Sequence, residues 1–208
     1  MAQKPTAAAN DAAWKKALYA PERVAKFVKG EMTLQELHGI TGPEMLEMAV
    51  TGYTMYEQGQ YKQAKVIFDG LSSLDPKEAY YRTALGAVHL AEGNLDEALR
   101  VLDEAIKLDT KDLAAFVNRG EAHLRKGDII KAAHDFKKAI ALDPTGKDPL
   151  TRRAKALSAA VLKSLEPASA TPAKPVNKAA APAAKTGNTG KQAAAPKPAA
   201  KGKPTHKR

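Results

Sequence analysis

The pattern of small and large apolar positions repeats along the middle of the chain at an interval of 34 residues. Four positions recur in three successive stretches: Gly52, Gly86 and Gly120; Gly59, Gly93 and Gly127; Ala64, Ala98 and Ala132; and Phe68, Leu102 and Phe136. A small residue, as at Gly52 and Ala64, lets two antiparallel helices cross closely. A glycine at the position of Gly59 can end a helix in a left-handed backbone conformation at little cost in free energy. The large residues are expected to fill the space between neighbouring units. The pattern predicts three helix pairs, at 45–78, 79–112 and 113–146.

Helical spacing continues on both sides of these units. A stack of repeated units leaves an apolar face bare at each end, so capping segments are expected. The apolar pattern of residues 147–165 predicts a C-terminal capping helix, with Arg152 and Arg153 largely on the opposite side. Its apolar positions are Leu150, Ala154, Leu157, Val161 and Leu165. Residues 14–44 predict an N-terminal helical cap, broken at Pro21 and Gly30, with these apolar residues: Trp14, Leu18, Val24, Phe27, Leu34, Leu37 and Ile40.

The two ends of the chain have a different composition. Residues 166–208 are rich in Ala, Pro and Lys, and Val176 is their one aliphatic residue larger than alanine. Such a segment buries too little apolar surface to offset its ordering entropy, so we expect disorder there and at 1–13. The tail carries about +8 of the formal net charge of +10. The tail is therefore either a solubilising appendage or a weak, salt-dependent electrostatic contact with nucleic acid, a membrane surface or an acidic partner. Nucleic-acid binding by the folded part is not expected.

Several classes of function find no support in the sequence. The chain has no cysteine, and it lacks an apolar run long enough for an export signal or a membrane span, so we expect a cytoplasmic protein without membrane insertion. His89 and His123 occupy equivalent repeat positions, which favours core packing. His38, His134 and His206 have no ligand partner at metal-binding spacing. We expect no metal, no cofactor and no enzymatic activity.

The 34-residue unit resembles the tetratricopeptide repeat, a helix-turn-helix module. The resemblance implies an all-α solenoid of three tandem repeats, in which positions 2, 5, 9 and 12 of each first helix line a concave groove. These positions are Leu46, Ala49, Tyr53, Tyr56, Tyr80, Thr83, Ala87, Leu90, Ala114, Val117, Glu121 and Leu124.

The predicted groove is mostly apolar, with tyrosines at one end. Tyr53 and Tyr56 are expected to face it, whereas Tyr61 and Phe68 are expected to pack internally, and the adjacent Tyr80 and Tyr81 cannot both face the same way. Tyrosine suits recognition because it combines a large contact area with a hydroxyl group. This character favours a hydrophobic segment over a carboxylate. Repeat proteins that clamp the acidic ends of heat-shock proteins need Lys and Asn where this chain has Ala49 and Tyr53.

A second resemblance rests on the segment before the repeats together with positions inside them. Residues 30–46 and the repeat positions resemble the class II chaperones of bacterial type III secretion; the residues are Gly30, Thr33, Leu34, Ile40, Met45, Tyr53, Tyr56, Gly59, Gln60, Tyr61, Ala64, Phe68, Leu85, Gly86 and Ala87. The resemblance implies a chaperone that holds a hydrophobic translocator segment in the groove, and possible homodimers through the N-terminal helices. Ala49 departs from the family pattern, in which an aromatic residue is usual. The alternative is a general tetratricopeptide adaptor in a bacterial assembly or regulatory complex.

Overall fold

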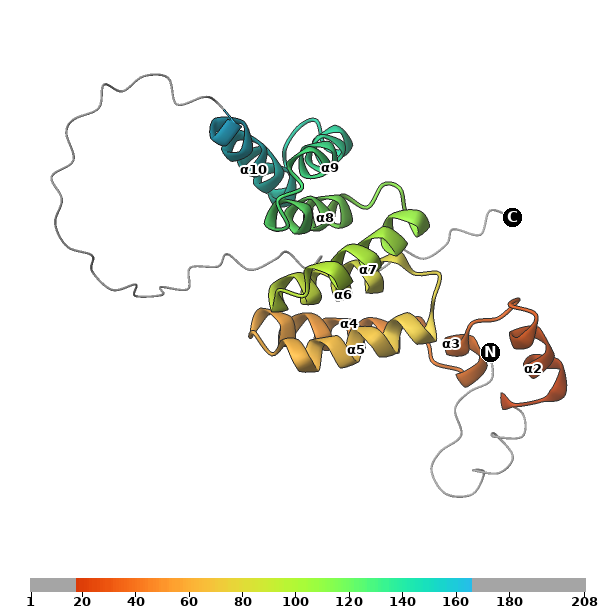
Figure 1. Ribbon diagram of the computed structural model, residues 1–208. Helices are drawn as coiled ribbons and strands as arrows, with labels where there is room; N and C mark the ends of the chain where they lie inside the picture. The colour runs from red at the N-terminus through yellow and green to blue at the C-terminus, as the bar shows by residue number, and fades with distance from the viewer. Residues whose placement is uncertain (1–17, 166–208) are drawn as a thin grey trace, which may run out of the picture.

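The computed structural model describes residues 18–165, and every regular element in this range is a helix (Figure 1). The terminal segments predicted to be disordered, and Trp14 of the predicted cap, lie outside the described residues. The helices are α2 (Pro21–Val28), α3 (Leu34–His38), α4 (Gly42–Glu57), α5 (Tyr61–Leu74), α6 (Ala79–Glu92), α7 (Leu95–Leu108), α8 (Leu113–Arg125), α9 (Ile129–Leu142) and α10 (Pro149–Leu165). The predicted all-α fold is confirmed.

The helices from α4 to α9 form three stacked pairs. Helix α4 packs on α5, α6 on α7 and α8 on α9, and each pair also contacts the next through α5 with α6 and α7 with α8. Figure 1 shows the pairs rising in order from α4 and α5 to α8 and α9, with α10 beside α9 at the top. Helices α6 and α8 begin at Ala79 and Leu113, the first residues of the second and third predicted units, and α4 begins at Gly42, just before the predicted Met45.

The crossing of the two helices in each pair leaves no room for a side chain at the first repeat glycine. A Cβ added at Gly86 would lie 2.5 Å from Cγ of Leu102, and one added at Gly120 would lie 2.7 Å from Cε1 of Phe136. The expectation that the large residues fill the space between units therefore needs correction, because each packs first against the glycine of its own unit. Phe68 does both: it also stacks edge-on with Tyr80 of the next unit, at 6.3 Å between ring centroids.

Polar groups end the helices and form the turns between units. Gly93 ends α6 with a left-handed backbone at φ 82°, which a residue with a Cβ rarely adopts. Asp75 and Asp109 each accept a hydrogen bond from the backbone N–H two residues later, at 3.1 and 2.8 Å. Asp143 accepts from the Thr145 hydroxyl and from backbone N–H groups, which lowers its pKa to about 2. The three repeated aspartates therefore stabilise equivalent turns.

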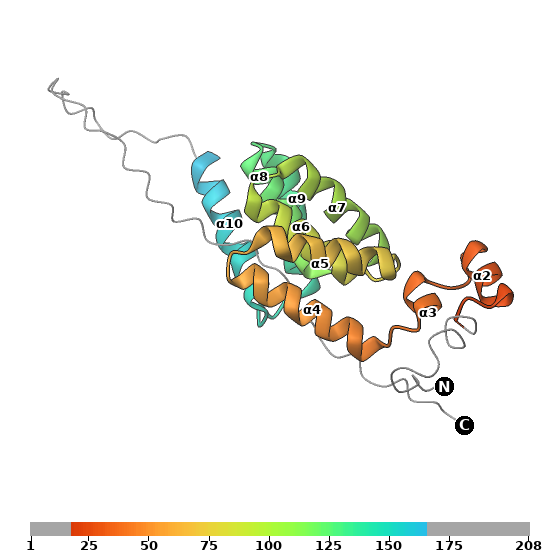
Figure 2. The ribbon, with the colours of Figure 1, turned by 90° about the horizontal axis from the view of Figure 1, so that it is seen from below.

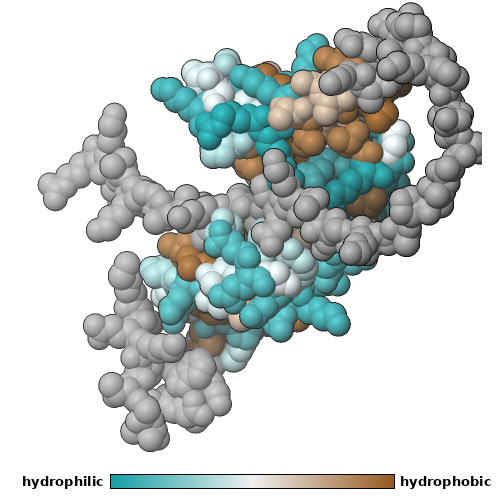
Figure 3. Space-filling view, turned by 90° about the vertical axis from the view of Figure 1, so that its left-hand side faces the viewer, coloured by the Kyte–Doolittle hydropathy of each residue, from teal (hydrophilic) through white to brown (hydrophobic). Residues whose placement is uncertain are grey.

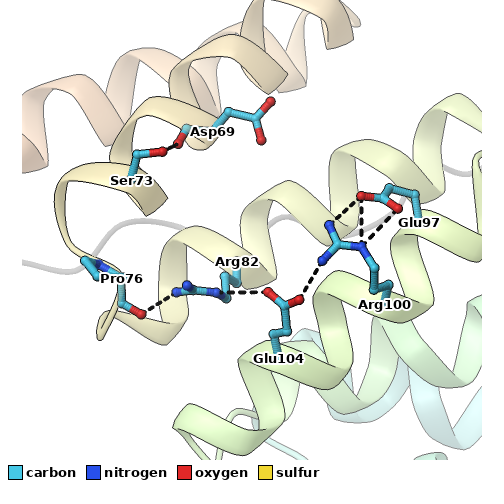
Figure 4. A network of polar contacts seen from close by, with 7 residues as sticks. All are labelled: Asp69, Ser73, Pro76, Arg82, Glu97, Arg100 and Glu104. Carbon is cyan, nitrogen blue, oxygen red and sulfur yellow. Dashed lines mark hydrogen bonds and ion pairs between the residues drawn. The ribbon is translucent and has the colours of Figure 1, made fainter.

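Charged side chains connect α6 and α7 (Figure 4). Arg82 of α6 donates to the carbonyl of Pro76 at 2.5 Å and to Glu104 of α7 at 3.3 Å, and Arg100 donates to Glu104 and Glu97. The exposed pairs of Arg100 with Glu97 and Glu104 contribute little to stability. The buried apolar contacts between the helices therefore hold the pairs together.

The two ends of the stack are capped differently. In α10, Ala154 and Val161 are buried and Leu150 and Leu157 pack against the core, as predicted for a capping helix. Capping boxes at Thr33 and Thr41 begin α3 and α4 at the other end. Helix α2 packs against α3 and buries none of its residues, and Figure 2 shows it set apart from the repeats.

The N-terminal cap thus differs from the prediction in its first half. Leu37 of α3 is buried and Ile40 packs on the core of the repeats, as expected. Val24 and Phe27 of α2 are each 37% exposed, and Val28 is 77% exposed. Gly30, which has a left-handed backbone at φ 74°, lies between α2 and α3 at the predicted break. None of the helices described between residues 18 and 165 is long and apolar enough to span a membrane.

Candidate functional site: the inner face

The predicted groove positions lie on α4, α6 and α8, the first helices of the three pairs, whose common surface we call the inner face. Four of the twelve side chains are partly accessible: Leu46, Tyr53, Tyr80 and Leu124. The other eight are buried: Ala49, Tyr56, Thr83, Ala87, Leu90, Ala114, Val117 and Glu121. The accessible side chains among the predicted positions are therefore apolar or aromatic, and they are fewer than the full predicted set.

The tyrosines form a cluster over the first two units. Tyr56, predicted to face the groove, is only 3% exposed and packs against Tyr61 with 5.7 Å between ring centroids. Tyr80 packs edge-on against Tyr81 and is half-buried, while Tyr81 is buried. Burial raises the pKa of Tyr53, Tyr56 and Tyr80, so these rings are neutral at physiological pH.

The small residues of the middle unit are already packed inside the molecule. Thr83 is fully buried, and its hydroxyl donates to Oδ2 of Asp112 at 2.5 Å. Asp112 also accepts from the backbone N–H of Ala115 at 3.0 Å, and it caps the N-terminus of α8. Burial raises the pKa of the Asp112 carboxyl. Thr83 thus joins α6 to the start of α8.

A charged cluster lies beside the third unit. The carboxylate of Glu121 accepts a hydrogen bond from Nη2 of Arg125 at 2.6 Å and another from Nη2 of Arg153 at 2.5 Å. Arg125 also donates from Nη1 to the carbonyl of Leu90 in the unit before, at 2.8 Å. The inner face is therefore charged at this end, which corrects the prediction of a mostly apolar surface.

Sequence reasoning missed both arginines of this cluster. Arg153 was predicted on the solvent side of the capping helix, but its side chain is only 21% exposed and reaches Glu121 of α8. The direction of that side chain depends on how α10 docks on α8, which no local pattern reveals. Arg125 carried a usable signal, because it follows Glu121 by four residues on the same helix, the spacing of a helical ion pair.

The histidines occupy structural positions. His89 is 3% exposed, and burial lowers its pKa, in agreement with the predicted core packing. His123 is half-buried beside Asp128, and His38 shares a hydrogen bond of 2.9 Å with the Tyr19 hydroxyl. Between residues 18 and 165, no three side chains of the kinds that bind metals lie close enough to hold an ion.

Comparison with known proteins identifies the repeat and the architecture. A model of the tetratricopeptide repeat matches residues 52–112 and 83–147. A type III secretion complex from Aeromonas hydrophila is 24% identical, with a TM-score of 0.60 over 70% of this chain and 99% of that chain. The type III secretion translocator chaperone SycD of Yersinia enterocolitica is 24% identical, with a TM-score of 0.58 over 62% and 98%. No curated protein sequence matches the chain.

A third similar structure contains a bound partner. PcrH, known from Pseudomonas aeruginosa, is 28% identical to this chain in its complex with the chaperone-binding region of PopD, with a TM-score of 0.55 over 61% of this chain and 96% of that one. The resemblance noted in the sequence therefore extends to the three-dimensional structure. It covers nearly the whole length of the similar chains and 61–70% of this chain.

Proposed function

Because the chain is a tetratricopeptide-repeat protein with the fold of the type III secretion translocator chaperones, we propose that it is a chaperone for a translocator-like protein. In this role the inner face binds a hydrophobic segment of the client and shields it from water. The protein acts by binding, without catalysis, and in the cytoplasm before its client is exported.

The observation that carries this proposal is the accessible part of the inner face. Leu46, Tyr53 and Tyr80 present apolar and aromatic surface from the first two units, and Leu124 continues it on the third. Half-buried tyrosines with few rotatable bonds lose little entropy on binding and are frequent among the residues that dominate binding energy. PcrH in complex with the chaperone-binding region of PopD, and SycD in complex with a peptide of the translocator YopD, support a translocator segment as the client.

Self-association through the N-terminal helices forms part of the proposal. Helix α2 leaves Val24, Phe27 and Val28 exposed on one short element that the repeats do not cover. An apolar helix face of this kind is stabilised when a second copy of the chain covers it. We expect the binding-competent form to contain two chains joined at α2.

Co-expression with a candidate translocator tests the client-binding role. The wild-type chain should move the translocator from the insoluble to the soluble fraction. Tyr53→Ala combined with Tyr80→Ala should abolish this effect, because each buried aromatic contact contributes about 1–2 kcal/mol. The matched control is Val66→Ala, a substitution at a 72% exposed apolar residue on α5. If the double variant solubilises the client as well as the control does, the inner face is not the binding surface and the adaptor role is favoured.

A further inference from the structure

Helices α7 and α9 hold equivalent places in the second and third units, yet their charged positions have opposite signs. Each is the second helix of its pair, and an interval of 34 residues relates the positions of one helix to those of the other. Three carboxylates of α7 correspond to three lysines of α9: Glu97 to Lys131, Asp103 to Lys137, and Glu104 to Lys138. The first unit has Gln63, Asp69 and Gly70 at these positions, so the repeat itself requires no charge there.

The carboxylates of α7 are bonded to arginines of the fold. Arg100 donates to Glu97 and to Glu104, each at 2.5 Å, as Figure 4 shows. Arg119 of α8 donates to Asp103 at 2.7 Å. The charges on this side of α7 are therefore paired.

Two of the three lysines of α9 have no such partner. Lys137 and Lys138 are exposed, and neither side chain forms a hydrogen bond or ion pair within residues 18–165. Lys131 is 67% exposed, with its Nζ 3.7 Å from the carboxylate of Asp128. Lys131 and Lys138 are two turns apart on the same side of the helix. This side of α9 therefore presents positive charge to the solvent.

No exposed carboxylate of α9 opposes this charge. Asp135, the one acidic residue of the helix, has a side chain that is 2% exposed and is paired with Arg119. Helix α10, which packs on α9, contains no Asp or Glu, and its Arg152 and Lys155 are exposed. Arg152 donates to the backbone carbonyl of Lys147, which is uncharged. Although residues 18–165 contain 21 basic and 21 acidic side chains, the end formed by α9 and α10 is thus basic.

The composition of the chain from α9 onward favours phosphate groups as the partner. Residues 129–208 contain 17 Lys and Arg against four Asp and Glu, and their one aromatic residue, Phe136, is buried. Binding of single-stranded nucleic acid uses exposed aromatic rings for base stacking, and helices that lie in a membrane surface bury apolar side chains there. Residues 166–208 have only Val176 as an aliphatic residue larger than alanine. The dense phosphates of a duplex need neither rings nor apolar side chains.

We propose that the exposed lysines of α9, together with the basic residues that follow α10, bind the phosphate backbone of double-stranded DNA without selecting a base sequence. Lysine contacts to phosphates supply affinity that falls as salt rises, and they carry no sequence information. The inference goes beyond the proposed function, since α9 lies outside the inner face. It also replaces the expectation, drawn from the nearly neutral total charge, that the folded part takes no part in nucleic-acid binding.

The salt dependence of DNA binding by the full chain tests the inference. Fluorescence anisotropy of a labelled duplex should show binding by the wild-type chain at low salt. Lys137→Gln with Lys138→Gln should reduce the slope of log K against log salt by about two, one for each lost phosphate contact. Lys131→Gln should reduce it by about one.

The matched control removes the same charge from another part of the stack. Lys62→Gln with Lys107→Gln replaces two exposed lysines, on α5 and α7, and should keep the wild-type slope. An unchanged slope in the α9 double variant, or an equal reduction in the control, would overturn the inference. Because all four side chains are exposed, both variants should keep the wild-type circular dichroism spectrum.

Vesicles of anionic phospholipid test a membrane as the rival partner. They are needed because Ile130 of α9 and Leu162 of α10 are 86% and 65% exposed. Vesicles that match the duplex in total phosphate should leave the duplex bound. Displacement of the duplex would assign the lysines to a membrane surface and overturn DNA binding.

Failure of this inference is distinguishable from failure of the proposed function. Lys137→Gln with Lys138→Gln should bring a translocator into the soluble fraction as the wild-type chain does. Loss of that effect in the α9 double variant would show that the lysines act in client binding, and it would overturn their assignment to DNA.

Discussion

The guanidinium of Arg119 on α8 forms a two-bonded ion pair with the buried carboxylate of Asp135 on α9. Nε lies 2.8 Å from Oδ2, and Nη2 lies 2.6 Å from Oδ1. The third nitrogen, Nη1, lies 2.7 Å from Asp103 on α7. One side chain thus joins the two helices of the third unit to the second helix of the unit before.

Removal of Arg119 should destabilise the fold strongly. Arg119→Ala leaves Asp135, whose side chain is 2% exposed, as a buried charge without its main partner, and such losses cost about 3–5 kcal/mol. Urea unfolding followed by circular dichroism measures the loss. The control is Arg100→Ala, which removes exposed pairs with Glu97 and Glu104 and should cost less than about 1 kcal/mol. Equal losses in the two variants would contradict the structural role of the Arg119 pair.

Two glycine-to-alanine substitutions should have opposite effects. Gly86→Ala places a methyl group 2.5 Å from Cγ of Leu102, and overpacking of this kind costs about 1–3 kcal/mol. Gly70→Ala on α5 meets nothing within 4 Å and should stabilise the protein by about 0.5–1 kcal/mol, because alanine is the better helix former. Thermal unfolding of the two variants measures both changes. A stabilised Gly86→Ala would show that the helices of the second unit are not as closely packed as described.

Mild acid should destabilise the protein through His89. Burial lowers the pKa of His89 below its ordinary value of 6.5; the charge of Lys65 acts the same way, against Glu97, Glu92 and Asp69. The unfolded chain therefore takes up a proton more readily, so this contribution to stability is present above pH 6.5 and is lost as the pH falls. Unfolding free energies between pH 7.5 and 5.5 should show a shallower slope in His89→Gln. The exposed His134→Gln controls for the loss of a histidine; an unchanged slope in His89→Gln would refute the assignment.

Charge on α2 should prevent self-association. Phe27→Asp with Val28→Asp places two carboxylates on the exposed apolar part of this helix, and like charges from two copies would repel at a shared interface. Light scattering after size exclusion should give a dimer for the wild-type chain and a monomer for the variant. The control is Ile130→Asp, at an 86% exposed apolar residue on α9. A monomeric wild-type chain would contradict the α2 interface.

The repeats could be predicted from sequence because each defining position has a steric requirement that few residues satisfy. Gly86 faces Leu102 within a space that excludes a Cβ, and Gly93 has a left-handed backbone, so residue identity and spacing carry the information. The placement of α2 depends instead on its contacts with α3, which include the hydrogen bond from Arg23 to the carbonyl of Glu36 at 2.6 Å. Its apolar residues have the same pattern whether a helix covers the repeats or stands apart from them.

The candidate site was harder to predict than the fold. Repeat geometry gave the helix faces, but not the depth of each side chain, so Tyr56 and Leu90 were expected at the surface and are buried. Figure 3 shows hydrophobic surface also in the upper part of the molecule, where α8 to α10 lie in Figure 1, and Leu162 of α10 is 65% exposed. The capping helix therefore contributes to the surface in ways that a repeat alignment does not describe.

The pairing of a glycine on one helix with a large residue on the next has a consequence for changes in chain length. Because consecutive units pack through equivalent helices, α5 with α6 and α7 with α8, an extra copy of residues 79–112 would meet the equivalent helix on either side and lengthen the array by one unit. A one-residue insertion within α6, between its start and Gly86, would instead rotate the glycine away from Leu102 and put a side chain at the crossing. Duplication of one whole repeat therefore lengthens the protein while keeping the packing between its helices.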